Sequence, residues 1–302
     1  MRNTIITALI LFVLAARPIA QDDHRAAVEK WRADRETSLK AKDGWLSVAG
    51  LFFLREGRNT FGSDPANNIV LPPSAPKHAG WFDLANGKVM AHVNDGVAAT
   101  FKKEPVREIE LKKTTDLAID NSLDIGTLSL FIHMSGDRIA IRMRDSESAA
   151  LKAFRGLQWY PIDPAYRLTA RLSLYAEPKA LEVPNIIGDV ERHTAPGLLA
   201  FTVNGQDYTV EPYLVKNQNG DRLWIVFRDA TSGKETYDAA RFVYADMPKP
   251  GETTTVLDFN RAYNPPCAFN PFTTCPLPTA QNRLKVRIEA GEKYTGHKSS
   301  SQ

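Results

Sequence analysis

A proline-rich segment near the carboxyl terminus, residues 257–278, constrains the fold of this chain more than any other feature. Proline fixes the backbone φ angle and removes a backbone hydrogen-bond donor, so this segment can be neither a helix nor a central strand of a sheet. The segment is also too rich in phenylalanine and tyrosine to be a solvated linker. We therefore predict an ordered loop that packs against the protein, and such loops often carry functional groups.

Residues 1–20 have the pattern of a secretory signal peptide. Arg2 supplies a short positive region, residues 5–14 are almost wholly apolar, and small residues precede a cleavage position after Ala20. An uncleaved membrane anchor is the alternative, but the apolar run is shorter than the roughly 20 residues that a spanning helix needs. We expect a periplasmic or secreted protein with no stable membrane anchor after cleavage.

The proline-rich segment contains both cysteines of the chain, Cys267 and Cys275. In an exported protein, two cysteines at this short spacing favour a disulfide that holds the loop in one shape. The alternative is a catalytic thiol at Cys267, which needs a basic neighbour to lower its pKa, and the nearest histidines are far along the chain. Two cysteines without a nearby histidine are also a poor zinc pattern. We predict a disulfide, no metal and no cofactor.

The charge of the chain argues against a polyanionic partner. The 38 basic and 35 acidic residues leave a formal charge of +3, and loss of Arg2 and Arg17 with residues 1–20 lowers it to +1. No contiguous run of lysine and arginine is longer than a pair, whereas a nucleic-acid-binding protein normally has a clustered basic stripe. We expect no nucleic-acid partner, and no pattern specifies an oligomeric state.

The pattern of apolar residues predicts one amino-terminal helix. Residues 21–43 are dense in alanine, glutamate, lysine and arginine, with Val28, Trp31 and Leu39 at helical spacing. Gly44 ends this pattern. The result is a charged amphipathic helix with a narrow apolar stripe.

Short strands separated by turns follow the helix. Asn86-Gly87 and Asn204-Gly205 are strong hairpin signals. Residues 128–134 and 138–144 alternate apolar and polar side chains, so one face of this hairpin should be core and the other largely solvated. Residues 284–289 show the same alternation and predict the last strand.

The distribution of these strands predicts a mainly β fold with two units. Many short strands without a βαβ rhythm indicate an antiparallel sandwich or barrel. We expect a smaller β subdomain at residues 44–155, a sandwich or barrel-like domain at residues 156–294, and a disordered tail at residues 295–302.

Several segments resemble one widespread bacterial family. The matching segments are residues 44–51 (GWLSVAGL), 62–65 (GSDP), 229–237 (DATSGKETY), 240–246 (ARFVYAD), the proline-rich segment, and residues 282–284 (NRL) and 289–293 (EAGEK). The family is catalogued as domain of unknown function 1684, and the resemblance covers nearly all of residues 30–293. Because the family has no established activity, the resemblance implies a relationship and no function.

Polar side chains at the start of the proline-rich segment form the predicted binding cluster. Alternation along the preceding strand places Asp258 and Asn260 on the face opposite Leu257 and Phe259, so the polar pair should point to solvent or into a cleft. A few fixed hydrogen-bonding groups suit a small polar or amphipathic ligand. The predicted ligand-binding residues are Asp258, Asn260, Arg261, Tyr263, Asn264 and Arg241.

Two other functions stay open. A hydrolase would use carboxylates such as Asp246 and Asp258, or Ser232, in the same cleft. No Gly-x-Ser-x-Gly motif supports the serine. A structural or interaction protein of the cell envelope needs no cleft, because the polar groups would only satisfy the backbone of the loop.

Overall fold

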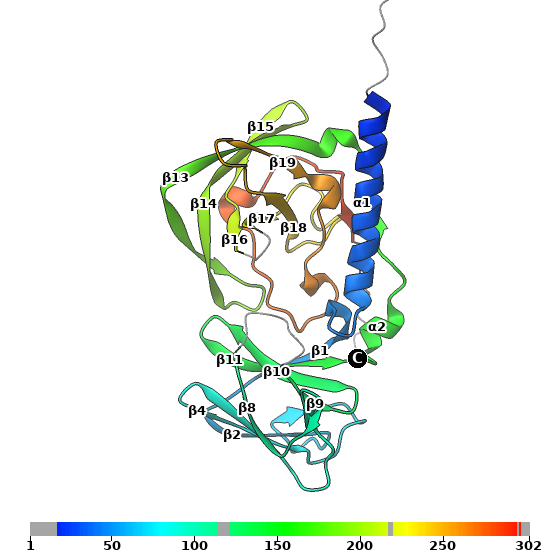
Figure 1. The fold of residues 1–302 in the computed structure, drawn as a ribbon, viewed down its shortest axis with the longest axis vertical. Helices are drawn as coiled ribbons and strands as arrows, with labels where there is room; N and C mark the ends of the chain where they lie inside the picture. Colours follow the sequence, from blue (N-terminus) through cyan, green and yellow to red (C-terminus); the bar gives the residue numbers. More distant parts are fainter. Residues whose placement is uncertain (1–16, 114–120, 217–219, 295, 297–302) are drawn as a thin grey trace, which may run out of the picture.

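The computed structural model describes residues 17–113, 121–216, 220–294 and 296. The predicted fold class is confirmed: the described chain is mainly β, with several antiparallel sheets in sandwich-like arrangement and one long helix (Figure 1). Most of the predicted signal peptide, residues 1–16, lies outside the described residues. Within the described part of the chain, no helix is long and apolar enough to cross a membrane.

The N-terminal unit, residues 48–145, is a sandwich of two sheets. Its strands are β1 (Val48–Phe53), β2 (Gly57–Gly62), β3 (Ile69–Val70), β4 (Gly80–Ala85), β5 (Lys88–Val93), β6 (Thr100–Phe101), β7 (Glu104–Pro105), β8 (Glu108–Leu111), β9 (Leu123–Ile125), β10 (Leu128–Ser135) and β11 (Arg138–Asp145). One sheet has the order β1-β11-β10-β9-β6-β7 and the other β3-β2-β4-β5-β8. Their facing sides share one hydrophobic core, in which the rings of Phe61 and Phe82 stack with centroids 4.5 Å apart.

The C-terminal unit, residues 158–293, contains the remaining sheets. Its strands are β12 (Gln158–Trp159), β13 (Arg167–Pro184), β14 (Val190–Val203), β15 (Gln206–Val210), β16 (Tyr213–Val215), β17 (Arg222–Phe227), β18 (Arg241–Asp246), β19 (Thr254–Asp258) and β20 (Glu292–Lys293). The sheet orders are β15-β14-β13-β19, β16-β17-β18 and β12-β20. Residues of the first two share a core in which Phe259 packs against Phe201 and Phe227, with centroids 5.5 and 5.4 Å away.

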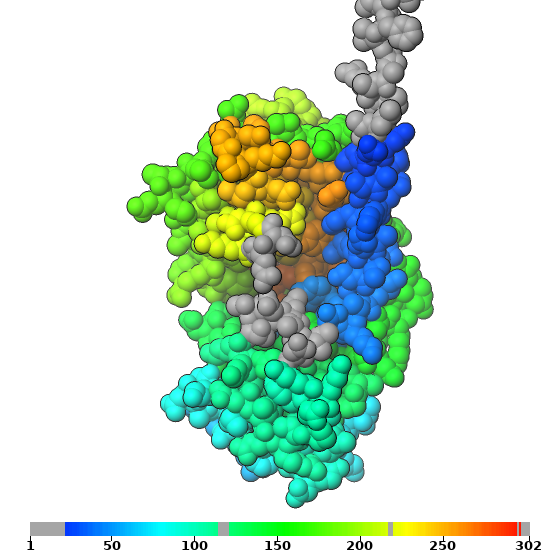
Figure 2. All heavy atoms as spheres, in the orientation of Figure 1, coloured from blue at the N-terminus to red at the C-terminus, as the bar shows by residue number. Residues whose placement is uncertain are grey.

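Helix α1 (Arg17–Lys40) lies along the C-terminal unit and reaches the junction with the N-terminal unit (Figures 1 and 2). It begins and ends slightly earlier than predicted. The expected apolar stripe is confirmed, because Val28 and Leu39 are buried and Trp31 is half-buried. The short helix α2 (Ala149–Ala153) and the 3₁₀ turn η1 (Trp45–Ser47) lie near the same junction. Further 3₁₀ turns are η3 (Pro164–Tyr166), η4 (Phe259–Arg261), η5 (Pro266–Ala268) and η6 (Ala280–Asn282).

The predicted hairpins are confirmed. Asn86 and Gly87 connect β4 and β5 with φ angles of 50° and 73°, and Asn204 and Gly205 connect β14 and β15 with 51° and 75°. Both residues of each turn are left-handed, a conformation that asparagine and glycine tolerate best. Local sequence therefore sets these two connections.

The hairpin of β13 and β14 forms a long arm that reaches the N-terminal unit (Figure 1). Its pairing shifts register between Leu174 and Lys179. At the tip of the arm, Asn185 Nδ2 donates to Ser135 Oγ at 3.0 Å. Arg138 also forms an ion pair with Asp189 at 2.7 Å. The arm thus joins the two units beside the β10–β11 turn.

The predicted strand at residues 284–289 is wrong. The Leu284 N–H donates to the Arg228 carbonyl at 2.8 Å, but the Ile288 N–H donates to the carboxylate of Asp229 at 2.7 Å. A side chain therefore takes the place of the neighbouring strand as hydrogen-bond partner. The segment is irregular although its apolar residues alternate.

Candidate ligand-binding pocket

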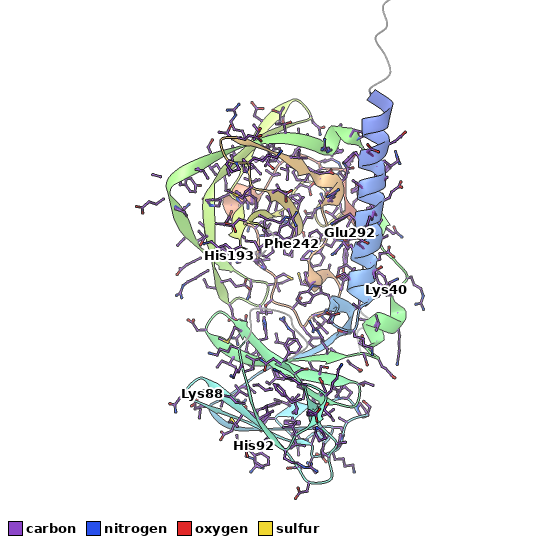
Figure 3. All side chains as sticks on the ribbon, in the orientation of Figure 1. Lys40, Lys88, His92, His193, Phe242 and Glu292 are labelled. Atoms are coloured by element: carbon purple, nitrogen blue, oxygen red, sulfur yellow. The ribbon has the colours of Figure 1, made fainter. Side chains whose placement is uncertain are left out.

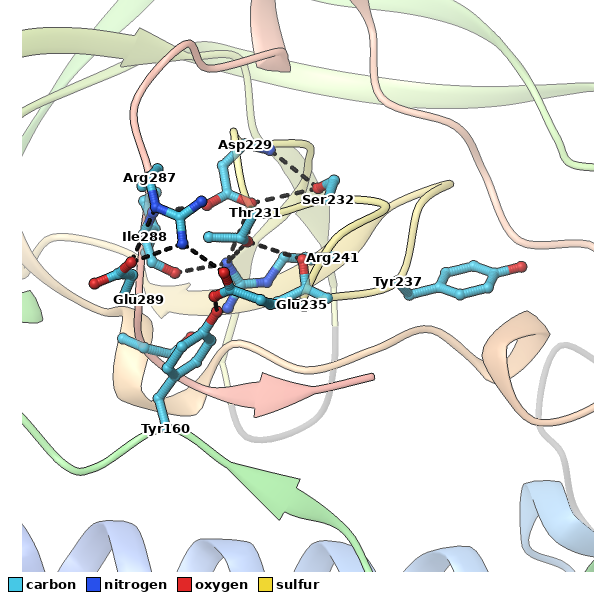
Figure 4. A network of polar contacts seen from close by, with 12 residues as sticks. Tyr160, Asp229, Thr231, Ser232, Glu235, Tyr237, Arg241, Arg287, Ile288 and Glu289 are labelled. Atoms are coloured by element: carbon cyan, nitrogen blue, oxygen red, sulfur yellow. Dashed lines mark hydrogen bonds and ion pairs between the residues drawn. The ribbon is translucent and has the colours of Figure 1, made fainter. Parts of the chain in front are cut away.

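Arg241 lies in a buried polar network (Figure 4). Its Nη1 atom is 3.3 Å from Oδ1 of Asp229, and both side chains are fully buried. The guanidinium also donates to the carbonyls of Ile288, at 3.0 Å, and Ala290. Asp229 in turn accepts a hydrogen bond from the Thr231 hydroxyl at 2.7 Å. These contacts hold the irregular segment after Leu284 against β18.

Asn260 and Asn264 are also buried and bonded to the protein. In the structure, strand β19 ends at Asp258, and Asn260 lies in the 3₁₀ turn η4. The alternation of buried and exposed side chains along the strand therefore does not extend to Asn260. Its amide donates to the Asp163 carbonyl at 2.8 Å and accepts from the Asp163 N–H at 2.9 Å. Asn264 Nδ2 donates to Glu292 Oε1 at 3.0 Å. Both amides tie separate chain segments together, as the structural alternative expects.

The other predicted residues line a groove beside α1. Asp258, Arg261 and Tyr263 contribute to this groove, whose volume is about 1040 Å³. His24 of α1 reaches into it, and its Nε2 atom is 2.8 Å from Oδ2 of Asp258. Arg261 Nε is 3.9 Å from the same carboxylate oxygen. The structure therefore brings Asp258, Arg261 and Tyr263 together at the groove. Asn260 is joined to them, because its Nδ2 donates to Oδ1 of Asp258 at 2.9 Å, whereas Arg241 and Asn264 bond to other parts of the protein.

The two carboxylates of the hydrolase alternative, Asp246 and Asp258, both line the groove beside α1, but Ser232 does not. Ser232 donates to Asp229 Oδ1 at 3.3 Å and accepts from the Asp229 N–H at 3.2 Å. No histidine hydrogen-bonds to Ser232 among the described residues, so no general base activates it there. Asp246 lines the groove beside α1, but its exposed carboxylate pairs with Arg222 at 3.1 Å.

The predicted disulfide is not formed. Cys267 and Cys275 are both free thiols, and the Cys267 N–H donates to Cys275 Sγ at 3.2 Å. A hydrogen bond to Cys275 and burial raise the pKa of the Cys267 thiol. Asn270 holds the loop: its amide donates to the Trp45 carbonyl at 2.9 Å and accepts from the Phe272 N–H at 3.0 Å. The two cysteines are neighbours, but hydrogen bonds set the shape of the loop.

An aromatic-walled pocket of about 840 Å³ lies between the two units. The aromatic wall consists of Trp224, Phe242, Tyr244 and Tyr263, and the proline-rich loop closes one side. Tyr244 stacks on Trp224 and on Tyr263, with centroids 6.1 and 6.4 Å apart. Phe242 lies inside the C-terminal unit and His193 on β14 (Figure 3). The pocket and the groove beside α1 share lining residues, including Tyr244 and Tyr263, and therefore adjoin.

The β10–β11 hairpin brings a buried guanidinium to this pocket. Arg142 lines it and is only 3% exposed, and Nε and Nη2 have no hydrogen-bond partner among the described residues. Burial lowers the pKa of Arg142 to about 10, so the group is still charged at neutral pH. Arg142 was not among the predicted site residues. The alternation of arginines with Ile139, Ile141 and Met143 was visible in the sequence, but it indicated a solvated face.

His133 lies on the same face of the hairpin. Its Nε2 atom is 3.0 Å from Oγ1 of Thr274 in the proline-rich loop. Burial, assisted by the positive charge of Arg142, lowers the pKa of His133 to about 3. The imidazole is therefore neutral at physiological pH and adds no charge to the pocket.

His133 should make the folded protein less stable in acid. Below about pH 6.5 the unfolded chain binds a proton at His133, whereas the folded protein does so only near pH 3. The free energy of unfolding therefore falls as the pH drops through this window. Relative to the wild type, His133→Gln should recover about 2–3 kcal/mol between pH 7 and pH 4.

Urea unfolding at several pH values measures this difference. The matched control is His78→Gln, since His78 is an exposed histidine of the N-terminal unit. Its pH profile should follow that of the wild type. Parallel profiles for His133→Gln and the wild type would contradict the prediction.

Comparison with known proteins places the C-terminal unit in a family. Residues 152–293 match the sequence pattern of the family described as "Protein of unknown function (DUF1684)". The DUF1684 region includes the aromatic wall of the pocket and the whole proline-rich loop. The resemblance seen in the sequence is thus confirmed for residues 152–293, and the match does not extend to the resembling segment at residues 44–51.

Other comparisons give no functional assignment. No curated protein matches the chain. Among solved structures, the solution NMR structure of an uncharacterized protein from Haloarcula marismortui is 28% identical. The match covers 47% of this chain and 78% of that chain, with a TM-score of 0.40.

Proposed function

We propose that this protein binds a small amphipathic molecule in the pocket between its two β units. The observation that carries the proposal is the pocket itself, with a volume of about 840 Å³ and a lining of aromatic rings together with charged and polar side chains. Small-molecule sites combine aromatic surface with hydrogen-bonding groups and usually measure about 300–1,000 Å³. The ligand class agrees with the one expected from the proline-rich segment, but the binding surface is a neighbouring one.

The lining supports an apolar body with a polar end. Trp224, Phe242 and Tyr244 offer ring surfaces, while Arg142 and Thr274 offer hydrogen-bonding groups. An aromatic ring or an alkyl chain would cover the rings and remove apolar surface from water. Binding, rather than a reaction, is proposed because Ser232 has no histidine partner among the described residues and the exposed carboxylate of Asp246 pairs with Arg222.

The neutral fluorescent probe N-phenyl-1-naphthylamine tests the proposal. The wild type should bind it at one saturable site, seen as a rise in probe fluorescence. Tyr244→Ala removes a half-buried ring from the wall and should weaken binding about 5- to 10-fold, since one aromatic contact contributes about 1 kcal/mol. Fluorescence titration gives both dissociation constants.

Tyr208→Ala is the matched control, because Tyr208 is also half-buried but packs against Phe201 away from the pocket. This variant should bind the probe like the wild type. Absence of saturable binding to the wild type would overturn the proposal. Equal weakening in both tyrosine variants would also count against this location.

A further inference from the structure

We infer that the ligand carries a single negative charge and that Arg142 binds it. The inference rests on the proposed function and names its ligand class: an organic monoanion, such as a carboxylate or sulfonate, with an apolar body. Arg142 points to this ligand class because it is a charged side chain that lines the pocket and is only 3% exposed. Its Nε and Nη2 atoms have no hydrogen-bond partner among the described residues.

Among the residues that the structure describes, no anion hydrogen-bonds to Nε or Nη2 of Arg142. Burial of a charge without a partner is strongly unfavourable. For this reason a protein is strongly destabilised when one partner of a buried ion pair is removed and the other charge is left unpaired. The nearest aromatic contact is weak, with Cζ of Arg142 5.7 Å from the ring of Trp45. A bound oxyanion would provide the missing acceptors, and a guanidinium can bind a carboxylate through two parallel hydrogen bonds.

The carboxylate that affects Arg142 is already engaged. Burial lowers the pKa of Arg142, and the charges of Cys275 and, to a smaller extent, Glu191 oppose this lowering. The Oε1 atom of Glu191 accepts from Asn185 Nδ2 at 3.1 Å, and its Oε2 atom is 3.3 Å from Nε2 of His193. Glu191 therefore balances part of the charge from a distance, while Arg142 lines the pocket and its Nε and Nη2 atoms have no hydrogen-bond partner among the described residues.

The other groups of the pocket limit the ligand to one negative charge. Asp137, Glu182 and Glu191 line it, so a dianion would meet three carboxylates. Arg192 also lines the pocket, but it is largely exposed and lies 3.9 Å from the carboxylate of Glu182. Arg35 is already paired with Glu292 at 2.6 Å. Trp224 Nε1 is buried without a hydrogen-bond partner among the described residues and offers a second, neutral donor.

Two probes of the same shape separate charge from apolar fit. 1-Anilinonaphthalene-8-sulfonate is N-phenyl-1-naphthylamine with one added sulfonate group. The wild type should bind the sulfonate at least 10-fold more tightly than the neutral probe. Arg142→Gln should weaken binding of the sulfonate at least 10-fold and of the neutral probe less than 2-fold, as expected for one charge-assisted contact.

Arg144→Gln is the matched control. Arg144 lies on the same face of β11, is also buried, and lines a different cavity. Its replacement removes the same charge and should leave both dissociation constants unchanged. The midpoint of thermal unfolding of Arg142→Gln should be no lower than that of the wild type, since the substitution removes a buried charge.

A wild-type experiment makes the test independent of the folding of any variant. Dodecanoate should displace the bound sulfonate probe at a lower concentration than dodecanol or dodecyl phosphate. If neither fluorescent probe binds the wild type, the proposed function fails. If the neutral probe binds but the sulfonate binds no more tightly, or dodecanol competes as well as dodecanoate, the charge assignment fails and the proposed function stands. Equal weakening of both probes by Arg142→Gln also refutes the role of Arg142.

Discussion

Asp229→Ala should lower the free energy of unfolding by about 3–5 kcal/mol, the usual cost of removing one partner from a buried ion pair. The alanine leaves the fully buried guanidinium of Arg241 without its carboxylate at 3.3 Å. It also removes the acceptor of the Ile288 N–H, which donates to Asp229 at 2.7 Å. Chemical denaturation at neutral pH, monitored by tryptophan fluorescence, measures the loss.

Two further variants show whether the buried charge is responsible. Asp246→Ala removes an exposed carboxylate that pairs with Arg222, and should cost less than about 1 kcal/mol. The double substitution Asp229→Leu with Arg241→Met removes both charges, and it should destabilise the protein less than the two single substitutions added together. A loss below about 1 kcal/mol for Asp229→Ala would show that the network in Figure 4 is not needed for stability.

Arg35→Met should destabilise the protein by a comparable amount, about 3–5 kcal/mol near pH 8. Arg35 Nε is 2.6 Å from Oε2 of Glu292, whose side chain is fully buried. The guanidinium also donates to the Asn264 carbonyl at 2.8 Å and lies 4.3 Å from the centre of the Tyr263 ring. Its removal therefore weakens the attachment of α1 and leaves a buried carboxylate unpaired.

The destabilisation of Arg35→Met should shrink as the pH falls. Burial raises the pKa of Glu292, and Arg35 opposes this rise. Without Arg35 the pKa should rise further, so the folded variant binds a proton at a pH where the unfolded chain does not. Protonation then favours the folded variant, and stability is lost as the pH rises through the raised pKa.

Unfolding measured at pH 8 and pH 5 tests this dependence. Arg25→Met is the matched control on the same helix, since Arg25 is exposed and lies 3.8 Å from Glu29. It should change stability by less than about 0.5 kcal/mol at either pH. A destabilisation of Arg35→Met that is the same at both pH values would contradict the role assigned to Glu292.

Local features of the chain were predictable because their causes are local. The hairpins at Asn86-Gly87 and Asn204-Gly205 depend on residues that tolerate positive φ. Helix α1 depends on the spacing of Val28, Trp31 and Leu39, and it formed within a few residues of the prediction. Similarly, Leu257 and Phe259 are buried as the apolar pattern required.

The site was predicted less completely, because the burial and the partners of each site residue depend on distant segments of the chain that pack over it. Asp258 and Asn260 are polar neighbours in sequence, yet Asp258 lines a groove and Asn260 is buried against Asp163. Alternation could not separate them, since the strand ends between them in a 3₁₀ turn. Cys267 and Cys275 are adjacent in space, but their spacing did not determine whether they are bonded.

The sequence by itself determined the mainly β character, the position of the long helix, the tight turns and the packing of the proline-rich loop. These follow from apolar periodicity and from the backbone limits of proline, glycine and asparagine. Only the tertiary structure decided that Arg142 is buried, because the surface that covers it comes from another unit far along the chain. The desolvation of that one guanidinium, and with it the pocket, arises from contacts between distant segments that no local pattern encodes.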